Sequence, residues 1–218
     1  NALYVMPRGS LKKELIACLR QGNGKRRPRS RGKDRRQQIP ELVSIHMRPP
    51  EIEDRLMPGH WEGDLIIGAN NRSAVGTLVE RTTRLVILAK MDGTTATAAA
   101  VGFSDKLNEV PRALRLSMTY DQGREMVKHA EITQKTGTAI YFADPHSPWQ
   151  RGSNENTNGL LRQYLPKGTD LSVYSQEELD EIADSLNTRP RKTLDWRTPL
   201  EVYAEVLKKS VAGPSTLQ

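Results

Sequence analysis

The sequence predicts an α/β fold in which a mixed five-stranded sheet carries helices on both faces. Three short segments rich in valine, isoleucine and leucine come first, separated by turn-like residues, and are expected to form an antiparallel meander. Helices and two further strands then alternate, a pattern typical of mixed sheets with helices packed on their faces. The 218 residues, 36% of them hydrophobic, suffice to bury a core without disulfides or a structural metal.

Composition excludes several classes of protein. No apolar run approaches the ~18 to 20 residues that a bilayer crossing requires, so no membrane span is expected. The single cysteine, Cys18, can form neither an intramolecular disulfide nor a cysteine-rich zinc site, which favours a reducing cytoplasm. The first residue is Asn1 rather than methionine and no secretory signal is recognisable, so we expect a fragment or a processed product.

Positive charge is concentrated at the front of the chain. Residues 1–60 hold 14 lysines and arginines against 6 acidic residues. Their net charge, 14 − 6 = +8, exceeds the net charge of +7 of the whole chain. Most of the excess lies in one run, consisting of Lys25, Arg26, Arg27, Arg29, Arg31, Lys33, Arg35 and Arg36. Such a run repels itself and has no apolar face to bury, so it is either a solvated linker or an arm that follows a phosphate backbone. We favour the arm.

The segment before the main domain contains one predicted helix and one connector. Apolar residues recur at helical spacing over Ser10–Gln21, and Gly22 is expected to end that helix. A proline-punctuated stretch, Ile39–Pro58, is expected to connect the basic run to the main domain. The predicted divisions are a helical remnant over 1–22, a basic linker or arm over 23–58, the main domain over 59–210 and a tail over 211–218.

The main domain begins with the three strands of the meander. They are predicted over Trp61–Ala69, Val75–Arg81 and Arg84–Met91, with turns at Asn70-Asn71 and Thr82-Thr83. The remaining elements are predicted as a helix over Thr94–Val110 with a threonine N-cap, a strand over Leu116–Tyr120, a helix over Gln122–Thr136, a strand over Thr138–Ala143, and helices over Gly152–Leu165, Ser175–Asn187 and Pro199–Lys209. Ser175 to Glu178 has the pattern of a capping box, and Pro199 suits a first helical turn.

Three carboxylates lie where a structural role does not account for them well. Asp64 interrupts an apolar strand, where an unpaired charge would cost several kcal/mol to bury. Asp121 ends a second apolar strand, and strand ends are where ligands collect in such sheets. Glu155 lies near the start of a helix. Each alone also has an ordinary explanation, because aspartates form turns and glutamates complement helix dipoles.

The chemistry of these three side chains favours magnesium. Mg²⁺ takes oxygen ligands and keeps several waters, so a pair of ions about 3.5 to 4 Å apart is held by a few carboxylates and a substrate phosphate. The order of the predicted elements resembles that of the ribonuclease-H-like fold.

Four sequence strings carry a resemblance to a known family. They are His60-Trp61-Glu62-Gly63-Asp64, Tyr120-Asp121-Gln122-Gly123, Ser147-Pro148-Trp149-Gln150-Arg151-Gly152-Ser153-Asn154-Glu155-Asn156-Thr157-Asn158 and Asn187-Thr188-Arg189-Pro190-Arg191-Lys192-Thr193-Leu194. Together they resemble bacterial insertion-sequence transposases of the IS-thirty group, within the superfamily of DDE transposases and retroviral integrases. The resemblance spans roughly residues 60–205, and 33 residues separate Asp121 from Glu155, as in this family's motif.

The resemblance implies roles for particular residues. Asp64, Asp121 and Glu155 are implied to be catalytic and to hold two Mg²⁺ ions, for which Mn²⁺ is expected to substitute. Arg162, seven residues after Glu155 on the same helical face, is implied to contact DNA. The resemblance also implies an N-terminal helix-turn-helix region that reads the element's ends. We expect this chain to begin after most of that region, so that its DNA binding depends on phosphates rather than bases.

Other candidate residues have a structural and a functional interpretation. His60 and His146 are expected to be ordinary structural or surface histidines rather than metal neighbours or proton carriers. Trp61 is expected to pack in the core, whereas Trp149 is equally suited to packing and to stacking on a base, and Trp149 and Arg151 are counted among the DNA-binding candidates. The acidic residues between Glu177 and Asp184 are expected to form a solvated helix face, with docking of a basic arm as the alternative.

By resemblance, the chain is expected to be a DNA transposase. It would hydrolyse a phosphodiester at a transposon end and join the resulting 3′-OH to target DNA, as a homo-oligomer in the bacterial cytoplasm at the nucleoid. Two alternatives remain open: a nuclease that cuts without joining, since the metal chemistry is shared, and a truncated, non-catalytic DNA-binding derivative.

Overall fold

The computed structural model describes residues 9–17 and 39–211 of the chain. The chain divides into two compact units at Arg36 and Gln37, and each is described by itself. In the first unit, helix α2 covers Ser10–Ala17, which confirms the start of the predicted helix. The continuation of that helix and the predicted basic arm lie outside the described residues.

The second unit is built on a single mixed sheet of five strands. These are β1 (His60–Ile67), β2 (Ala74–Glu80), β3 (Val86–Lys90), β4 (Ser117–Tyr120) and β5 (Ala139–Phe142). Their spatial order is β3-β2-β1-β4-β5, with antiparallel pairing among the first three strands of the chain and parallel pairing of β1 with β4 and of β4 with β5. The predicted fold class and all five predicted strands are confirmed, with ends shifted by one or two residues.

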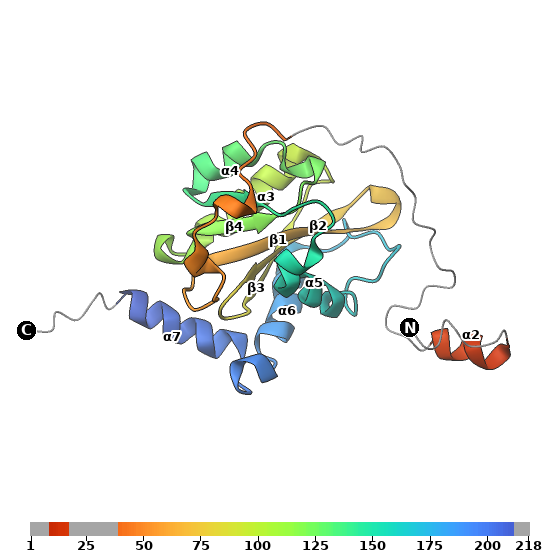
Figure 1. Cartoon of the computed structure of the whole chain (residues 1–218). Coiled ribbons are helices and arrows are strands. Elements are labelled where there is room, and N and C mark those ends of the chain that lie inside the picture. The colour runs from red at the N-terminus through yellow and green to blue at the C-terminus, as the bar shows by residue number, and fades with distance from the viewer. Residues whose placement is uncertain (1–8, 18–38, 212–218) are drawn as a thin grey trace, which may run out of the picture. The chain divides into compact units, whose positions relative to one another are not determined.

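Helices cover both faces of this sheet (Figure 1). The helices of this unit are α3 (Ala96–Glu109), α4 (His129–Thr136), α5 (Gly152–Leu161), α6 (Gln176–Asn187) and α7 (Pro199–Val211). Short 3-10 turns lie at Ile45–Met47, Pro50–Ile52, Ala69–Asn71, Arg112–Leu114, Arg124–Met126, Pro148–Arg151 and Lys192–Leu194. Thr95 caps α3, Ser175 and Glu178 form the predicted capping box, and Pro199 begins α7. No helix among the described residues has the length and apolar composition needed to cross a bilayer.

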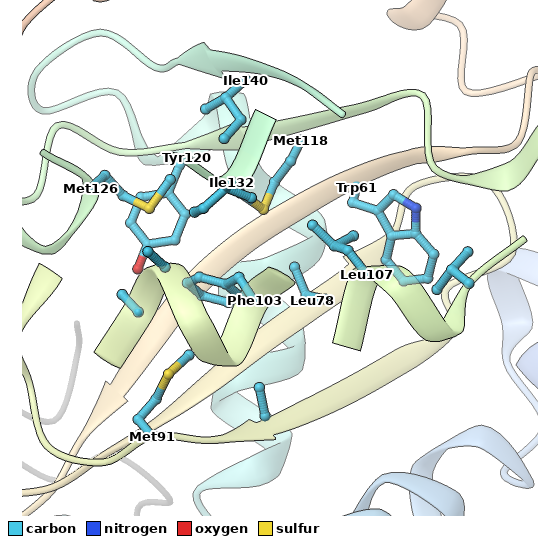
Figure 2. Packing of buried hydrophobic residues seen from close by; sticks show 14 of the residues in the cluster. Trp61, Leu78, Met91, Phe103, Leu107, Met118, Tyr120, Met126, Ile132 and Ile140 are labelled. Atoms are coloured by element: carbon cyan, nitrogen blue, oxygen red, sulfur yellow. The ribbon is translucent and has the colours of Figure 1, made fainter. Parts of the chain in front are cut away.

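Two hydrophobic clusters hold the layers together. The first joins α3 and α4 to one face of the sheet, and Figure 2 shows Trp61, Phe103 and Tyr120 within it. Trp61 is fully buried and donates a hydrogen bond from Nε1 to the Leu114 carbonyl at 2.8 Å, which confirms its predicted core role. The second cluster joins α5 and α6 to the opposite face through residues such as Ile66.

Alternation along β1 decides which of its side chains face α5. Trp61 belongs to the cluster under α3 and Ile66 to the cluster under α5 and α6. Since successive side chains of a strand point to opposite faces, Glu62 and Asp64 share the face of Ile66. The strand therefore presents two carboxylates in succession to the layer that contains α5.

The helix predicted over Gln122–Thr136 is divided in the structure. A 3-10 turn covers Arg124–Met126, and α4 starts only at His129. The backbone of Gly123 is extended, and its N–H donates to the carboxylate of Asp121 at 3.1 Å. This local bond competes with helix formation directly after β4, as aspartate side chains commonly do.

The predicted connector Ile39–Pro58 packs on the second unit. Ile39, Ile45 and Ile52 are buried, and the Phe142 N–H donates to the Val43 carbonyl at 2.9 Å. The stretch thus covers the outer side of β5. Its prolines predicted a connector to the main domain, and its three buried isoleucines hold this connector against that domain.

The opposite edge of the sheet, β3, is covered by side-chain amides of α6. Asn187 accepts from the Val86 N–H at 2.8 Å and donates to the Val86 carbonyl at 2.9 Å. At the other end of α6, Gln176 accepts from the Lys90 N–H and donates to the Leu88 carbonyl, both at 2.9 Å. Two amide groups thereby take the place of a neighbouring strand.

Candidate active site

Asp64 lies on β1, near the middle of the strand. Its side chain is 25% exposed, and it accepts hydrogen bonds from the Leu65 N–H and from Asn158 Nδ2, each at 2.9 Å. Burial raises the pKa of the Asp64 carboxyl above its usual value, and the nearby Asp121 raises it further, against the opposing effect of Arg151. The ionised form of Asp64 is therefore incompletely compensated by the protein.

Strand pairing brings Asp121 next to Asp64. Strands β1 and β4 are parallel, with Glu62 opposite Thr119. Asp64 and Asp121 lie two residues after these positions, so both carboxylates lie beside the carboxyl end of the shorter strand β4. The Asp121 side chain is 46% exposed, and the resulting pair opens to solvent at the carboxyl end of β4, where sheets of this kind commonly bind ligands.

A single guanidinium lies against both aspartates. Arg151 Nη1 is 3.6 Å from Asp64 Oδ1, and Nη2 is 3.5 Å from Asp121 Oδ2. Arg151 also donates to the Gly63 carbonyl at 3.0 Å and lies over the ring of Tyr120, 5.9 Å from its centre. Its side chain is only 9% exposed. Sequence analysis counted Arg151 among the DNA contacts, whereas the structure places its charged group inside the carboxylate site.

Glu155 lies in the first turn of α5 and is exposed. Asn158, one turn later on the same helical face, contacts Asp64. In the described ranges, no hydrogen bond or ion pair links Glu155 to either aspartate, and no three acidic, histidine or cysteine side chains are grouped closely enough to hold a metal. The structure brings Asp64 and Asp121 together and leaves Glu155 near them without direct contact.

Glu125 is a further carboxylate at this site that sequence analysis missed. Burial raises the pKa of Glu125, and the charges of Asp121 and Asp64 raise it further. Its spacing of four residues from Asp121 was an available signal, because residues four apart are neighbours on a helix, but sequence analysis did not use it. Like Asp64, Glu125 is a carboxylate whose ionised form is disfavoured by its neighbours.

The residues present fit a divalent cation. Hard ions such as Mg²⁺ bind carboxylate oxygens, and a cation would relieve the mutual repulsion that raises the pKa of both Asp64 and Glu125. Arg151, at 3.5 to 3.6 Å, supplies only one positive charge to this group. Asp64 and Asp121 supply oxygen donors directly, and Glu155 lies within one helical turn of a residue that touches Asp64.

Helix α5 is held against the sheet by a buried polar network. Asn154 donates from its backbone N–H to Glu62 Oε2 at 2.9 Å and from its side chain to the Glu62 carbonyl at 2.7 Å. Thr77 on β2 donates to Asn154 Oδ1 at 3.1 Å. Glu62 is fully buried and pairs with Arg81 at 3.3 Å. These bonds fix the turn of α5 that carries Glu155.

The other predicted site residues have different surroundings. Arg162 donates from its guanidinium to the backbone carbonyls of Ile67 and Leu165, both at 3.3 Å, so part of its hydrogen-bonding capacity is used within the fold. Trp149 is 71% exposed on the turn that precedes Arg151. His60 is buried and bonds Ser117 at 2.8 Å, as expected of a structural histidine, and His146 is exposed.

Comparisons with known proteins agree in pointing to one family. The model of the integrase core domain matches residues 54–148. A transposase of insertion sequence IS1086 from Cupriavidus metallidurans is 69% identical over 207 residues, covering 95% of this chain and 61% of that protein. The transposase InsI of insertion sequence IS30A from Escherichia coli K12 is 43% identical over 205 residues, covering 93% and 53%. The chain thus spans between half and two thirds of the length of these relatives.

A solved structure shares the fold. It is a simian T-cell lymphotropic virus intasome in complex with PP2A regulatory subunit B56 gamma, which matches with a TM-score of 0.55 and 16% identity over 76% of this chain and 60% of that one. At this identity the likeness concerns the fold alone.

Proposed function

This chain belongs to the IS-thirty group of insertion-sequence transposases, which contain an integrase core domain, and we propose from that premise that it is a metal-dependent polynucleotidyl transferase. Its reactions would be hydrolysis of a phosphodiester at a transposon end and transfer of the 3′-OH to target DNA. The observation that carries the proposal is the pair Asp64 and Asp121, which two parallel strands bring together beside the carboxyl end of β4 and which share one guanidinium.

Asp64, Asp121 and Glu155 would hold the metal. When bound, a pair of divalent ions supplies charge stabilisation to the attacking and leaving oxygens of an in-line displacement at phosphorus. The chain's own contribution is to position its ligands: Asn158 orients Asp64 through a bond of 2.9 Å, and Asn154 ties the first turn of α5 to Glu62. Arg151 holds the two aspartates together and partly offsets their repulsion. Such preorganisation is the main task of a protein that forms no covalent intermediate.

The proposed partner is DNA. Within the proposal, the basic run from Lys25 to Arg36 follows the phosphate backbone, and Trp149 and Arg162 contact DNA near the carboxylates. The exposure of Trp149 supports such a contact. We propose assembly as a homo-oligomer, since two transposon ends must meet, and action in the bacterial cytoplasm on nucleoid DNA.

A strand-transfer assay tests the function. The chain is incubated with a labelled duplex that has a pre-cut 3′-OH end and with supercoiled plasmid, in Mg²⁺, in Mn²⁺ or with EDTA. Joined product is expected with either metal and is expected to vanish with EDTA and in Asp121→Asn. The matched control is Asp105→Asn, an exposed aspartate on α3 at the opposite face of the sheet, which should join DNA normally.

The other outcomes identify the alternatives. Metal-dependent nicking with no joined product would indicate a nuclease. Salt-sensitive binding with no product in any metal would indicate a non-catalytic DNA-binding chain. That result would overturn the proposal for the chain of residues 1–218.

A further inference from the structure

A second polar site lies at the amino end of α5. It is a pocket of about 290 Å³, close to the lower limit of pockets that hold small ligands. Arg55, Arg84 and Arg191 line it together with Gly152, Ser153 and Asn156 of α5. The three arginines come from separate parts of the chain: before β1, between β2 and β3, and after α6. The fold thus gathers three guanidinium groups around one cavity.

The three arginines of this pocket have no carboxylate in direct contact among the described residues. No carboxylate lines the pocket, and in the part of the chain that the structure describes Arg55, Arg84 and Arg191 form no ion pair. Arg84 donates to the Ser153 hydroxyl, and Arg191 donates to the Leu186 carbonyl at 3.3 Å. Burial lowers the pKa of Arg84 and the nearby Arg55 lowers it further, although Glu62 and Glu80 act in the opposite sense.

The remaining lining groups suit an anion with several oxygens. Helix α5 begins at Gly152, and its first turn carries the positive end of the helix dipole together with backbone N–H groups. Asn156 and Thr193 add an amide and a hydroxyl, whereas the Thr157 hydroxyl donates to the Ser153 carbonyl at 2.9 Å. Guanidinium groups recognise phosphate oxygens through paired N–H donors, a geometry that a single lysine cannot supply.

The pocket is separate from the carboxylate site. Residues of a helix are spaced by about 100°, so Ser153 and Asn156 point away from the face shared by Glu155 and Asn158. Asn156 nevertheless follows Glu155 directly in the chain. An anion in the pocket would therefore lie on another side of α5 from Glu155 and would not enter the metal site.

We propose that the pocket between Arg55, Arg84, Arg191 and the amino end of α5 binds one non-scissile phosphate of the DNA backbone. It would fix the DNA relative to Glu155 by holding a neighbouring nucleotide. This inference rests on the proposed function, because it takes DNA as the ligand, and it adds a positioning site that the carboxylate chemistry does not require.

Binding without catalysis provides the test. The full chain and the variants Arg55→Ala and Arg191→Ala are titrated with duplex DNA in EDTA, over a series of salt concentrations. Each variant is expected to bind about five- to tenfold more weakly, and the salt slope should fall by about 1 for each lost phosphate contact. The matched control is Arg112→Ala, an exposed arginine just before β4, where the same charge is removed outside the pocket. Arg55→Lys should retain more affinity than Arg55→Ala.

Neutral methylphosphonate linkages, introduced one position at a time, locate the phosphate. At one position, replacing the phosphate should weaken DNA binding by the unmodified chain. The same replacement should weaken binding by Arg191→Ala little further, since the two changes remove one contact. The bound phosphate could belong to transposon-end DNA or to target DNA. Comparing the affinity for a linear duplex with 3′-OH ends with that for a closed circle of the same sequence distinguishes the two sources.

Two results would overturn the inference: affinities and salt slopes of both pocket variants equal to those of Arg112→Ala, or methylphosphonate effects that add fully to Arg191→Ala at every position. Since the titrations contain no metal, they remain decisive even if the chain joins no DNA. Conversely, a chain that joins DNA but shows no pocket effect refutes only this inference.

Discussion

Glu62 and Asp64 lie two residues apart on the same face of β1, each beside an arginine, and yet they have opposite surroundings. Glu62 is fully buried, pairs with Arg81 at 3.3 Å and accepts from the Asn154 N–H. Asp64 is 25% exposed, lies 3.6 Å from Arg151 and faces a second aspartate. A carboxylate inside an apolar strand therefore does not by itself indicate a catalytic residue. Exposure to a ligand and incomplete compensation of its charge distinguish Asp64.

The largest expected effect is the loss of activity on replacing Asp64, which distinguishes it from Glu62. Asp64→Asn should reduce strand cleavage and joining by at least about a thousandfold, because an amide cannot replace a carboxylate as a ligand of a hard cation. Its free energy of unfolding should be equal to or above that of the unmodified chain, because the charge that burial and Asp121 disfavour is gone. Urea unfolding beside the joining assay measures both quantities. Retained activity would remove Asp64 from the catalytic group.

The next largest effect is the loss of stability on replacing Glu62, which distinguishes it from Asp64. Glu62→Gln should lower the free energy of unfolding by up to about 3–5 kcal/mol, because the buried Arg81 keeps only the more distant Glu53, at 3.9 Å, as a partner charge. Any loss of activity should follow the folded fraction at each urea concentration. A Glu62→Gln chain of normal stability that failed to cleave DNA would show that Glu62 has a direct role in the reaction.

Gly63, between the two carboxylates, gives a smaller effect. A methyl group at this position would lie 2.8 Å from the Tyr120 ring and 2.9 Å from the Met118 sulfur. Gly63→Ala should therefore lower the free energy of unfolding by about 1–3 kcal/mol through overpacking. Leu65→Ala on the same face of β1 serves as the control for a change that removes side-chain volume. An unchanged free energy of unfolding in Gly63→Ala would mean that β1 and β4 can separate slightly at no cost.

The smallest expected effect concerns pH. Arg151 lowers the pKa of Asp64, so Arg151→Gln should raise that pKa further. Since cation binding requires the ionised carboxylate, the acid limb of the activity profile should move to higher pH, by about one unit or less. Rates of joining between pH 5 and 8, at saturating Mg²⁺, measure the shift. Movement to lower pH would show that Arg151 does not act on Asp64 as a charge.

Much of the fold could be predicted from sequence because its signals are local. The alternation of apolar residues and the turn residues identified five strands in their order along the chain, and the structure pairs β1 with β4 in the sheet. The capping box at Ser175 and the proline at the start of α7 were equally local. Asp64 and Asp121 were recognised because a charge in or after an apolar strand is conspicuous.

The parts that sequence did not predict depend on contacts between distant residues. Nothing in the chain indicates that Arg81 pairs with Glu62, or that Arg151 turns inward to both aspartates rather than outward to DNA. The division of the predicted Gln122–Thr136 helix depends on one bond from Gly123 to Asp121. The arginine pocket likewise forms from three segments that are far apart in sequence.

The covered edges of the sheet have a consequence for the behaviour of the protein at high concentration. Unpaired strand edges are templates for intermolecular β-pairing and aggregation. Here Asn187 and Gln176 bond the outer side of β3, and Val43 bonds β5. The sheet is thereby protected from polymerising through its two edges. Two amide side chains, remote from any chemistry, contribute to its solubility.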